Sequence, residues 1–193
     1  MSQTSFKIEE HQGICVAHLQ SEDGTNRLTR NCVMSLTEAL RDLALHCRGL
    51  IIAGNNRFFS TGAELEEVSA VAGPNAFEFA KQGQALMNTI QNFPAPVYAA
   101  ISGYCMGGGL DLAISCHRRI AAPNAVFGHR GAALGLMTGW GGTQRLPRLI
   151  GKGRTLAMFV AAETIQAMRA LEIGLIDAIA EDPVAEAVLR IRG

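Results

Sequence analysis

The chain has 193 residues, of which 48% are hydrophobic and 18% charged, a composition typical of a globular domain with a substantial core. Its 17 Lys and Arg residues balance its 17 Asp and Glu residues, so the charge gives no support for nucleic acid or an anionic membrane as the main partner. No apolar run reaches the ~18 residues of a membrane span, and the N-terminal stretch MSQTSFKIEEHQG lacks the apolar segment of a signal peptide. We therefore expect a cytoplasmic protein.

In the first half of the chain, segments with apolar residues at helical spacing alternate with short apolar segments typical of strands. In chain order, the pattern predicts two strands within residues 5–19, a helix over 32–47, a strand at 50–54, a helix over 75–93 and a strand at 97–102. The two short strands, LIIAG and VYAAIS, are continuously apolar, as in parallel strands that are buried on both faces.

The second half continues this alternation with shorter elements. The pattern predicts a helix over 109–116, strands in RRIAAP and AVFGH, a glycine-led helix in GWGGTQRLPRLIG, helices over 154–163 and 166–172, a strand in LIDAIA and a helix over 184–192. Strands that alternate with helices predict an α/β fold with mainly parallel pairing. Because no linker, low-complexity tract or charge block interrupts the chain, we expect one domain over residues 1–193.

The cysteines follow no metal-binding or disulfide pattern. Their number is odd, their spacing is irregular, and no C-x-x-C pair occurs among Cys15, Cys32, Cys47, Cys105 and Cys116. We expect buried free thiols in a reducing compartment and no metal site.

Two glycine-containing loops follow buried strands. In LIIAGNNRFFSTGAEL the loop reaches Gly62 and Ala63, and in VYAAISGYCMGGGLDLAIS it reaches Gly107–Gly109, which open a helix. Ligands bind at the carboxyl ends of strands in open α/β sheets, and the first amides of a helix have no partner within it. Two amides, one from each loop, can therefore converge on one oxygen as an oxyanion hole. A glycine run before a helix is more often only a tight turn, so the pair of loops, not one alone, favours a site.

Several stretches together resemble the crotonase (enoyl-CoA hydratase/isomerase) superfamily. FFSTGAELEEV is similar to its F-s-x-G-A-D-L loop, and ISGYCMGGGLDLAISCHRRIAAPNAVFG to its G-x-x-x-G-G-G-x-E-L-A-x-x-C-D stretch. ALGLMTGWGGTQRLPRLIGKGRTLAM resembles the L-G-x-x-P-G-x-G-G-T-Q-R-L stretch, and ALEIGLIDAIA the A-x-x-x-G-L-V-D ending. Asn26 and Leu28 match an early N-A-L motif. The likeness covers nearly the whole chain, in order.

The resemblance implies a spiral of ββα units with mainly parallel sheets, assembled as a homo-oligomer, a trimer or a hexamer. It implies an acyl-CoA substrate and an enzyme of fatty-acid metabolism, with coenzyme A as part of the substrate and no other cofactor. The oxyanion-hole amides then belong to Ala63 and Gly108. The residues that would contact substrate are Gly62, Gly107, Gly131, Thr138 and Trp140.

The sequence departs from the family pattern at its acids. The first catalytic glutamate corresponds to Asp111, the second to Gly131, and a third acidic position used by some members to Gly139. Asp111 suits acid/base catalysis, or only the capping of a helix N-terminus. His129 lies two residues before the lost glutamate, and an imidazole can also act as acid or base.

The chain also stops at Gly193, near the point where family members continue into several further helices. The resemblance therefore does not indicate which residues form the oligomer contact or the wall around the acyl tail.

Three functions follow from these residues. The first is a hydratase or isomerase of enoyl-CoA with Asp111 as the acid/base. The second is another crotonase-type reaction, such as decarboxylation, which needs the hole but not both glutamates. The third is binding of an acyl thioester without turnover. Replacing Asp111 with Asn separates them, because only the first requires that carboxylate.

Overall fold

The structure is a computed structural model that describes residues 4–193 and leaves the first three residues of the polar N-terminal stretch outside it. Its main sheet has six strands in the order β1-β2-β4-β7-β9-β12, and a smaller sheet has the order β11-β10-β8-β5. β3 and β6 form a third, short sheet. The bounds of the strands are β1 (Thr4–His11), β2 (Ile14–Ser21), β3 (Arg27–Leu28), β4 (Gly49–Ala53), β5 (Phe58–Ser60), β6 (Gly62–Ala63), β7 (Val97–Ile101), β8 (Tyr104–Met106), β9 (Arg118–Ala121), β10 (Val126–Gly128), β11 (Thr164–Gln166) and β12 (Ala178–Ile179).

Most strand pairs are parallel, as the alternation of strands and helices predicts. Only the pairs β1–β2 and β10–β11 are antiparallel within the described residues. The helices that connect the strands are α1 (Arg30–Leu43), α2 (Leu65–Ala70), α3 (Pro74–Gln91), α4 (Gly108–Ser115), the 3₁₀ helix η1 (Arg130–Leu134), α5 (Gly142–Ile150), α6 (Lys152–Val160), α7 (Ala167–Glu172) and α8 (Pro183–Arg192).

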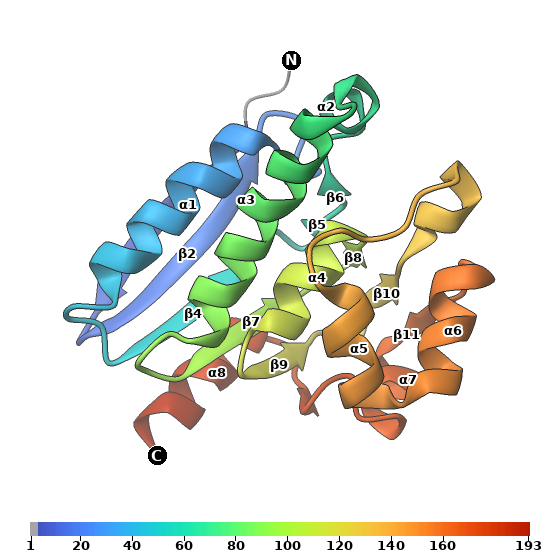
Figure 1. The fold of residues 1–193 in the computed structure, drawn as a ribbon. Helices are drawn as coiled ribbons and strands as arrows, with labels where there is room; N and C mark the ends of the chain where they lie inside the picture. The colour runs from blue at the N-terminus through green and yellow to red at the C-terminus, as the bar shows by residue number, and fades with distance from the viewer. Residues whose placement is uncertain (1–3) are drawn as a thin grey trace.

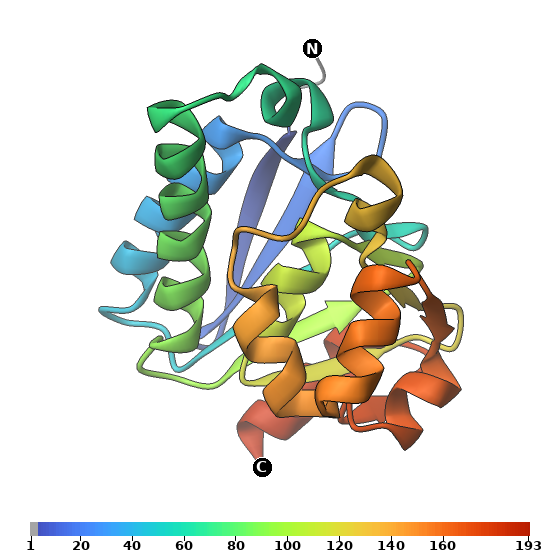
Figure 2. The ribbon, with the colours of Figure 1, turned by 45° about the vertical axis from the view of Figure 1, so that its right-hand side comes forward.

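The helices cover both faces of the main sheet. α1 and α3 lie side by side on one face, and α8 lies on the other (Figure 1). α5, α6 and α7 gather beside the smaller sheet, and the segment between η1 and α5 arches across the molecule towards α3 (Figure 2). Within the part of the chain that the structure describes, no helix is long and apolar enough to cross a membrane.

The alternation of side chains along β2 divides the core into two layers. Cys15, Ala17 and Leu19 face the large cluster beneath α1 and α3. Ile14 and Val16 face the smaller cluster beneath α8. This period of two is what a strand imposes, and burial on both faces explains why β4 and β7 read as continuous apolar runs.

Hydrogen bonds from two polar side chains, His117 and Arg119, join strands of the main sheet to neighbouring segments. His117 accepts the Val97 amide through Nδ1 at 2.9 Å, and its Nε2 lies 3.0 Å from the Gln91 carbonyl oxygen. Buried Arg119 reaches Asp177 at 3.1 Å and the Leu175 carbonyl oxygen at 2.7 Å. His117 thus joins the start of β7 to the end of α3, and Arg119 joins β9 to the segment before β12.

The structure corrects two sequence-based expectations. The strand expected in LIDAIA contains only Ala178–Ile179, because the Asp177 carboxylate bonds to the backbone and side chain of Arg119 at the start of that segment. The expectation of free thiols is wrong for Cys15 and Cys47, which form a disulfide. Cys32, Cys105 and Cys116 are free and buried, as expected.

Candidate active site

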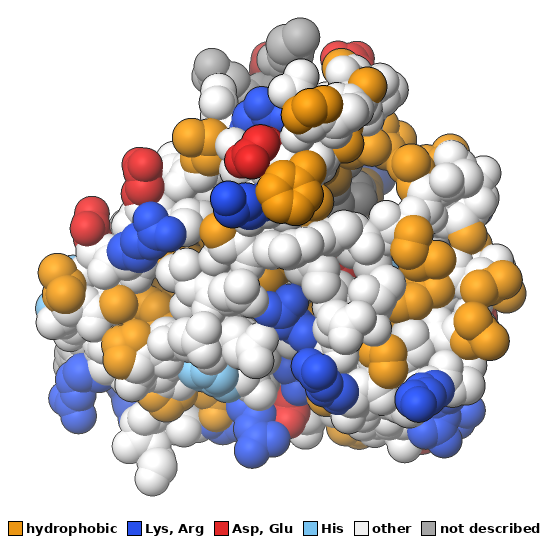
Figure 3. Space-filling view, viewed as in Figure 1, with side chains coloured by type: hydrophobic (Ala, Val, Ile, Leu, Met, Phe, Trp, Pro, Cys, Tyr) orange, Lys and Arg blue, Asp and Glu red, His pale blue; other side chains and the backbone are white. Residues whose placement is uncertain are grey.

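A cavity of ≈ 600 Å³ opens beside the N-terminus of α4. Its walls come from β6 and α2, from α3, from the start of α4 and from the segment between β10 and α5. Most of the lining is apolar, while a few polar groups converge at one end, as in small-molecule sites. Figure 3 shows hydrophobic side chains around the hollow near the upper centre and on the lobe at the right. The predicted site residues in the wall are Ala63, Gly107, Gly108, Asp111, His129, Gly131, Thr138 and Trp140.

The two glycine-containing loops meet at this polar end. A Cβ added to Gly108, the first residue of α4, would lie 3.2 Å from the Ala63 amide nitrogen. Gly62, with φ of 97°, does not line the cavity but packs behind it, where a Cβ would lie 2.7 Å from the Gly108 nitrogen. Glycine at position 62 therefore allows the backbones of the two loops to approach closely.

Buried polar side chains fix the first of these loops. Asn26 donates to the Phe58 carbonyl oxygen at 3.0 Å, and the Ser60 hydroxyl donates to the Asn26 carbonyl oxygen at 2.7 Å. The same hydroxyl oxygen accepts the Gly62 amide at 3.1 Å. The Ala63 and Gly108 amides are thus held beside one another before any ligand arrives, which is the property that an oxyanion hole requires.

Asp111 lies in the first turn of α4, and its carboxylate is 2% exposed. Thr138 donates its hydroxyl to Oδ2, whereas Oδ1 has no hydrogen-bond partner among residues 4–193. Oδ1 lies against the first residue of α5, because a Cβ added to Gly142 would come within 2.1 Å of it. The carboxylate therefore sits between the N-termini of two helices, whose partial positive charge favours an anion.

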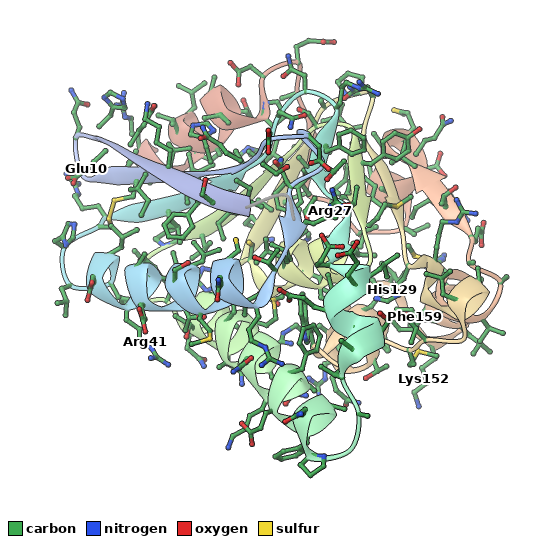
Figure 4. The ribbon with its side chains drawn as sticks, turned by 90° about the horizontal axis from the view of Figure 1, so that it is seen from above. Glu10, Arg27, Arg41, His129, Lys152 and Phe159 are labelled. Atoms are coloured by element: carbon green, nitrogen blue, oxygen red, sulfur yellow. A yellow bond between two sulfur atoms is a disulfide. The ribbon has the colours of Figure 1, made fainter. Side chains whose placement is uncertain are left out.

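His129 follows β10 and completes the polar end of the cavity. Its Nε2 lies 3.8 Å from Asp111 Oδ2. Its ring packs edge-on against Phe159, with 5.0 Å between ring centroids (Figure 4). His129 is buried, and its Nε2 has no hydrogen-bond partner in the part of the chain that the structure describes. A buried polar atom without a partner is costly, and Asp111 and His129, which each carry one such atom among the described residues, both line the cavity.

A model of the family described as enoyl-CoA hydratase/isomerase matches residues 9–191. The chain belongs to the enoyl-CoA hydratase/isomerase family. A Bacillus subtilis strain 168 protein named probable enoyl-CoA hydratase is 43% identical over 184 residues, which cover 94% of this chain and 70% of that protein. The crotonyl-CoA hydratase of Syntrophomonas wolfei is 33% identical over 186 residues, which cover 94% of this chain and 71% of that protein.

Solved structures of enoyl-CoA hydratases have the same fold. The crystal structure of the enzyme from Bacillus anthracis matches with a TM-score of 0.91 at 28% identity, over 97% of this chain and 75% of that chain. The predicted crotonase-type α/β fold with mainly parallel sheets is therefore confirmed, as is membership of a superfamily of enzymes that act on CoA thioesters.

Gly131, which the resemblance aligns with the second family glutamate, lies in a tightly packed loop. Gly131 lies in η1, and its carbonyl oxygen accepts the Leu136 amide at 2.8 Å. A Cβ at position 131 would lie 2.9 Å from the Leu136 carbonyl oxygen. Any side chain at this position would therefore require the loop to move. This segment instead places the polar side chains of His129, Arg130 and Thr138 in the cavity wall.

Trp140 closes the side of the cavity that faces α3. Cβ atoms added to Gly83 and Gly108 would lie 2.2 Å and 2.6 Å from its indole ring, and the Phe79 ring centroid is 5.5 Å away. Gln84 donates to the Gly139 carbonyl oxygen at 2.7 Å and so ties the loop that carries Trp140 to α3. The ring therefore has a fixed place beside the predicted oxyanion hole.

Arg145 ties the same loop to α3 from the other side. Its guanidinium donates to Asn88 at 2.7 Å and to Gln91 at 2.8 Å. Partial burial lowers the pKa of Arg145, and the nearby Asp111 carboxylate acts in the opposite direction. The arginine thus adds a positive charge behind the buried carboxylate.

Reading motifs alone misses a basic residue of the cavity wall. Arg27 lies in the cavity wall, with its Nε 3.4 Å from a Glu64 carboxylate oxygen (Figure 4). Arg27 carries no spacing signal, because β3 reaches the cavity only through tertiary packing. Tyr104, in contrast, is exposed and stacks on Phe58 outside the cavity.

Proposed function

We propose that the protein adds water to a 2-enoyl-CoA thioester, or moves its double bond, through an enolate held in a backbone oxyanion hole. In this proposal the thioester oxygen accepts hydrogen bonds from the Ala63 and Gly108 amides, and Asp111 and His129 transfer the protons. The observation that carries the proposal is a pair of buried atoms without a hydrogen-bond partner among residues 4–193, Asp111 Oδ1 and His129 Nε2, in side chains that line the same cavity as Ala63 and Gly108.

Hydration requires a base, an acid and a site for the developing negative charge. Thr138 holds Asp111 Oδ2 and leaves Oδ1 free to take a proton from water as its oxygen bonds to C3 of the thioester. C2 then takes a proton from His129 Nε2, which lies 3.8 Å from Asp111 Oδ2, and the proton that Asp111 took from water passes to His129, so that both groups return to their starting states. The product gains one hydroxyl and one hydrogen, and each proton transfer needs contact within hydrogen-bond reach.

The oxyanion hole stabilises the enolate, which forms when the water oxygen bonds to C3 and is consumed when C2 takes its proton. One oxyanion-hole donor is worth about 3 to 4 kcal/mol of transition-state stabilisation in a well-studied case. An apolar cavity strengthens this effect, because it removes the water that would screen the negative oxygen. Gly62, Gly107, Gly131, Thr138 and Trp140 would form or support the surface around the bound thioester.

Decarboxylation of a malonyl-type thioester is a second candidate. It is favoured by Gly131, which leaves the position of the second family glutamate without a side chain. Loss of CO₂ gives the same enolate and needs the amides but no activated water. A non-catalytic thioester-binding role would also use the hole, without proton transfer by Asp111.

We further propose that coenzyme A, as part of the substrate, is the only cofactor moiety, and that the protein is a cytoplasmic trimer or hexamer that binds neither nucleic acid nor membranes. Oligomerisation is supported by exposed apolar side chains on α6, α7 and α8, namely Leu156, Val160, Met168 and Leu189. Analytical ultracentrifugation at micromolar concentration tests this assembly, and a monomer would contradict it.

The reaction is tested with 2-butenoyl-CoA in water, by following the absorbance of its conjugated bond and identifying the product by mass. Hydration predicts loss of the band and a mass gain of one water, whereas isomerisation is tested with a 3-enoyl thioester and gives a new conjugated band without a change of mass. If neither occurs although the thioester binds, malonyl-CoA tests the second candidate through release of CO₂. Binding without any turnover would overturn both enzymatic functions.

A further inference from the structure

A cluster of potential metal ligands lies away from the active site, at the tip of the β1–β2 hairpin. Cys15 of β2, Cys47 and His46, which follow α1, bring two sulfurs and one imidazole nitrogen within 4.8 Å of one another. Glu10 pairs with Cys15 across the hairpin, and its carboxylate lies 3.9 Å from His46 Nε2. Figure 4 shows the disulfide beside Glu10, at the edge of the molecule.

Backbone hydrogen bonds hold this cluster independently of the disulfide. β2 pairs with β4, so that Cys15 lies next to Leu50, and the Arg48 amide donates to the Gly13 carbonyl oxygen at 2.7 Å. The amides of His46 and Cys47 both donate to the Leu43 carbonyl oxygen, at 3.1 Å and 2.9 Å, in the last turn of α1. The two cysteines therefore keep their places when the sulfur–sulfur bond is broken.

The spacing suits a tetrahedral ion once the thiols are free. The two cysteine Cα atoms are 6.3 Å apart. Zn²⁺ binds thiolate sulfur at about 2.3 Å and imidazole nitrogen at about 2.0 Å, so two sulfurs on one ion stand roughly 3.8 Å apart. Small side-chain rotations reach that separation without backbone movement. Thiolate and imidazole are also the ligands that select zinc over magnesium or calcium.

The cluster has an apolar side and an open side. Cys15 is fully buried and Cys47 nearly so, whereas the side chains of His46 and Glu10 are 52% and 50% exposed. An ion can therefore enter from solvent past His46, and the fourth position faces water and the Glu10 carboxylate.

We propose that Cys15, Cys47 and His46 form a redox-gated zinc site. In the oxidised state the sulfurs are bonded to each other and cannot ligate an ion. A dithiol reductant transfers two electrons and two protons, which gives two cysteine thiols and the oxidised reductant. Zn²⁺ then displaces the two thiol protons and binds both thiolates and the imidazole. The site is independent of the proposed reaction on acyl-CoA.

The test compares zinc binding by the reduced and the oxidised protein. The full chain is reduced with a dithiol, freed of reductant without oxygen, and titrated with Zn²⁺ against a chromophoric chelator. We expect one Zn²⁺ per reduced chain and at least about 100-fold weaker binding by the oxidised chain. Titration with Co²⁺ should add the near-ultraviolet absorption of thiolate-to-metal charge transfer.

Matched variants identify the ligands. His46→Ala should weaken zinc binding by the reduced protein tenfold or more, while His11→Ala, at the exposed end of β1, should leave it unchanged. Cys47→Ser should abolish tight binding, and Cys32→Ser, at a buried free thiol, should not. The proposal is overturned if the reduced protein binds no zinc, if the oxidised protein binds it equally well, or if His46→Ala and His11→Ala behave alike.

Discussion

At the scale of single residues, the site depends on two buried atoms, Asp111 Oδ1 and His129 Nε2, that have no hydrogen-bond partner in the described part of the chain. Asp111 could be selected from sequence because it follows three glycines in a family motif. Its pairing with Thr138, its contact with Gly142 and its distance of 3.8 Å from His129 could not, since these residues lie 18 to 31 positions further along the chain. Sequence spacing carries no signal for contacts made by tertiary packing.

Replacing Asp111 with Asn keeps the volume of the side chain and removes its charge and basicity. Because general acid–base catalysis contributes roughly 10²- to 10⁴-fold, we expect kcat/KM to fall at least about 100-fold while the Kd for a saturated acyl-CoA changes little. Steady-state rates and calorimetric binding measure the two. Glu66→Gln, at an exposed carboxylate in the cavity wall, is the matched control and should keep full activity. Equal losses in both variants would remove Asp111 from the mechanism.

Position 131 allows a direct test of the altered loop. Gly131→Glu restores the residue type of the family pattern, but its Cβ would press on the Leu136 carbonyl oxygen at 2.9 Å. Because overpacking typically costs about 1 to 3 kcal/mol, we expect lower thermal stability and no gain in activity. Gly135→Ala, where φ is 69° but nothing lies within 4 Å, provides a control for loop strain alone. A more active Gly131→Glu enzyme would contradict the role given to His129.

At the scale of elements, periodicity predicts the long helices well and the short strands poorly. α1, α3 and α8 begin and end within a few residues of their predicted bounds. β5, β6, β8 and β11 have only two or three residues each, too few for an alternation to be visible. Yet β6 and β8 carry or precede the loops of the predicted hole, so sequence located the loops while missing the strands that hold them.

The middle of α3 shows how packing can reverse a helix propensity. Alanine is favoured over glycine inside a helix by roughly 0.5 to 1 kcal/mol, but a Cβ at Gly83 would lie 2.2 Å from the Trp140 ring. We expect Gly83→Ala to lower the free energy of unfolding by about 1 to 3 kcal/mol. Gly153→Ala in α6, where nothing lies within 4 Å, should raise it instead. Urea denaturation of both variants checks the signs, and stabilisation by Gly83→Ala would show that Trp140 does not fill that space.

At the scale of the whole molecule, the disulfide joins the first hairpin to the end of α1. Composition and cysteine spacing predict free thiols. That prediction misses the disulfide because the contact between Cys15 and Cys47 comes from the pairing of β2 with β4, which cysteine spacing does not reveal. The remaining cysteines are deep in the core. Burial raises the pKa of the Cys32 and Cys116 thiols to about 12, and it raises the pKa of Cys105 well above its usual value. They therefore stay protonated and unreactive near neutral pH.

Thiol counting tests this distribution. In the oxidised native protein at pH 8, an aromatic disulfide reagent should react slowly, because the free thiols are buried and protonated. After unfolding in guanidinium it should count three thiols, and after prior reduction five. Breaking the bond, which spans 32 positions, should lower the free energy of unfolding by up to about 3 to 4 kcal/mol in the chain-entropy account. Five thiols without reduction would show that Cys15 and Cys47 are not bonded.

The central claim, that the Ala63 and Gly108 amides polarise a thioester carbonyl, is tested most directly by carbon-13 NMR. A butyryl-CoA labelled at its carbonyl carbon is bound to the wild-type protein and to the Asp111→Asn variant. Two hydrogen bonds to the oxygen draw electron density from the carbon, so we expect a downfield shift of the bound resonance in both proteins. A bound thioester whose carbonyl resonance stays at its position in water would contradict the oxyanion hole, whatever reaction the enzyme performs.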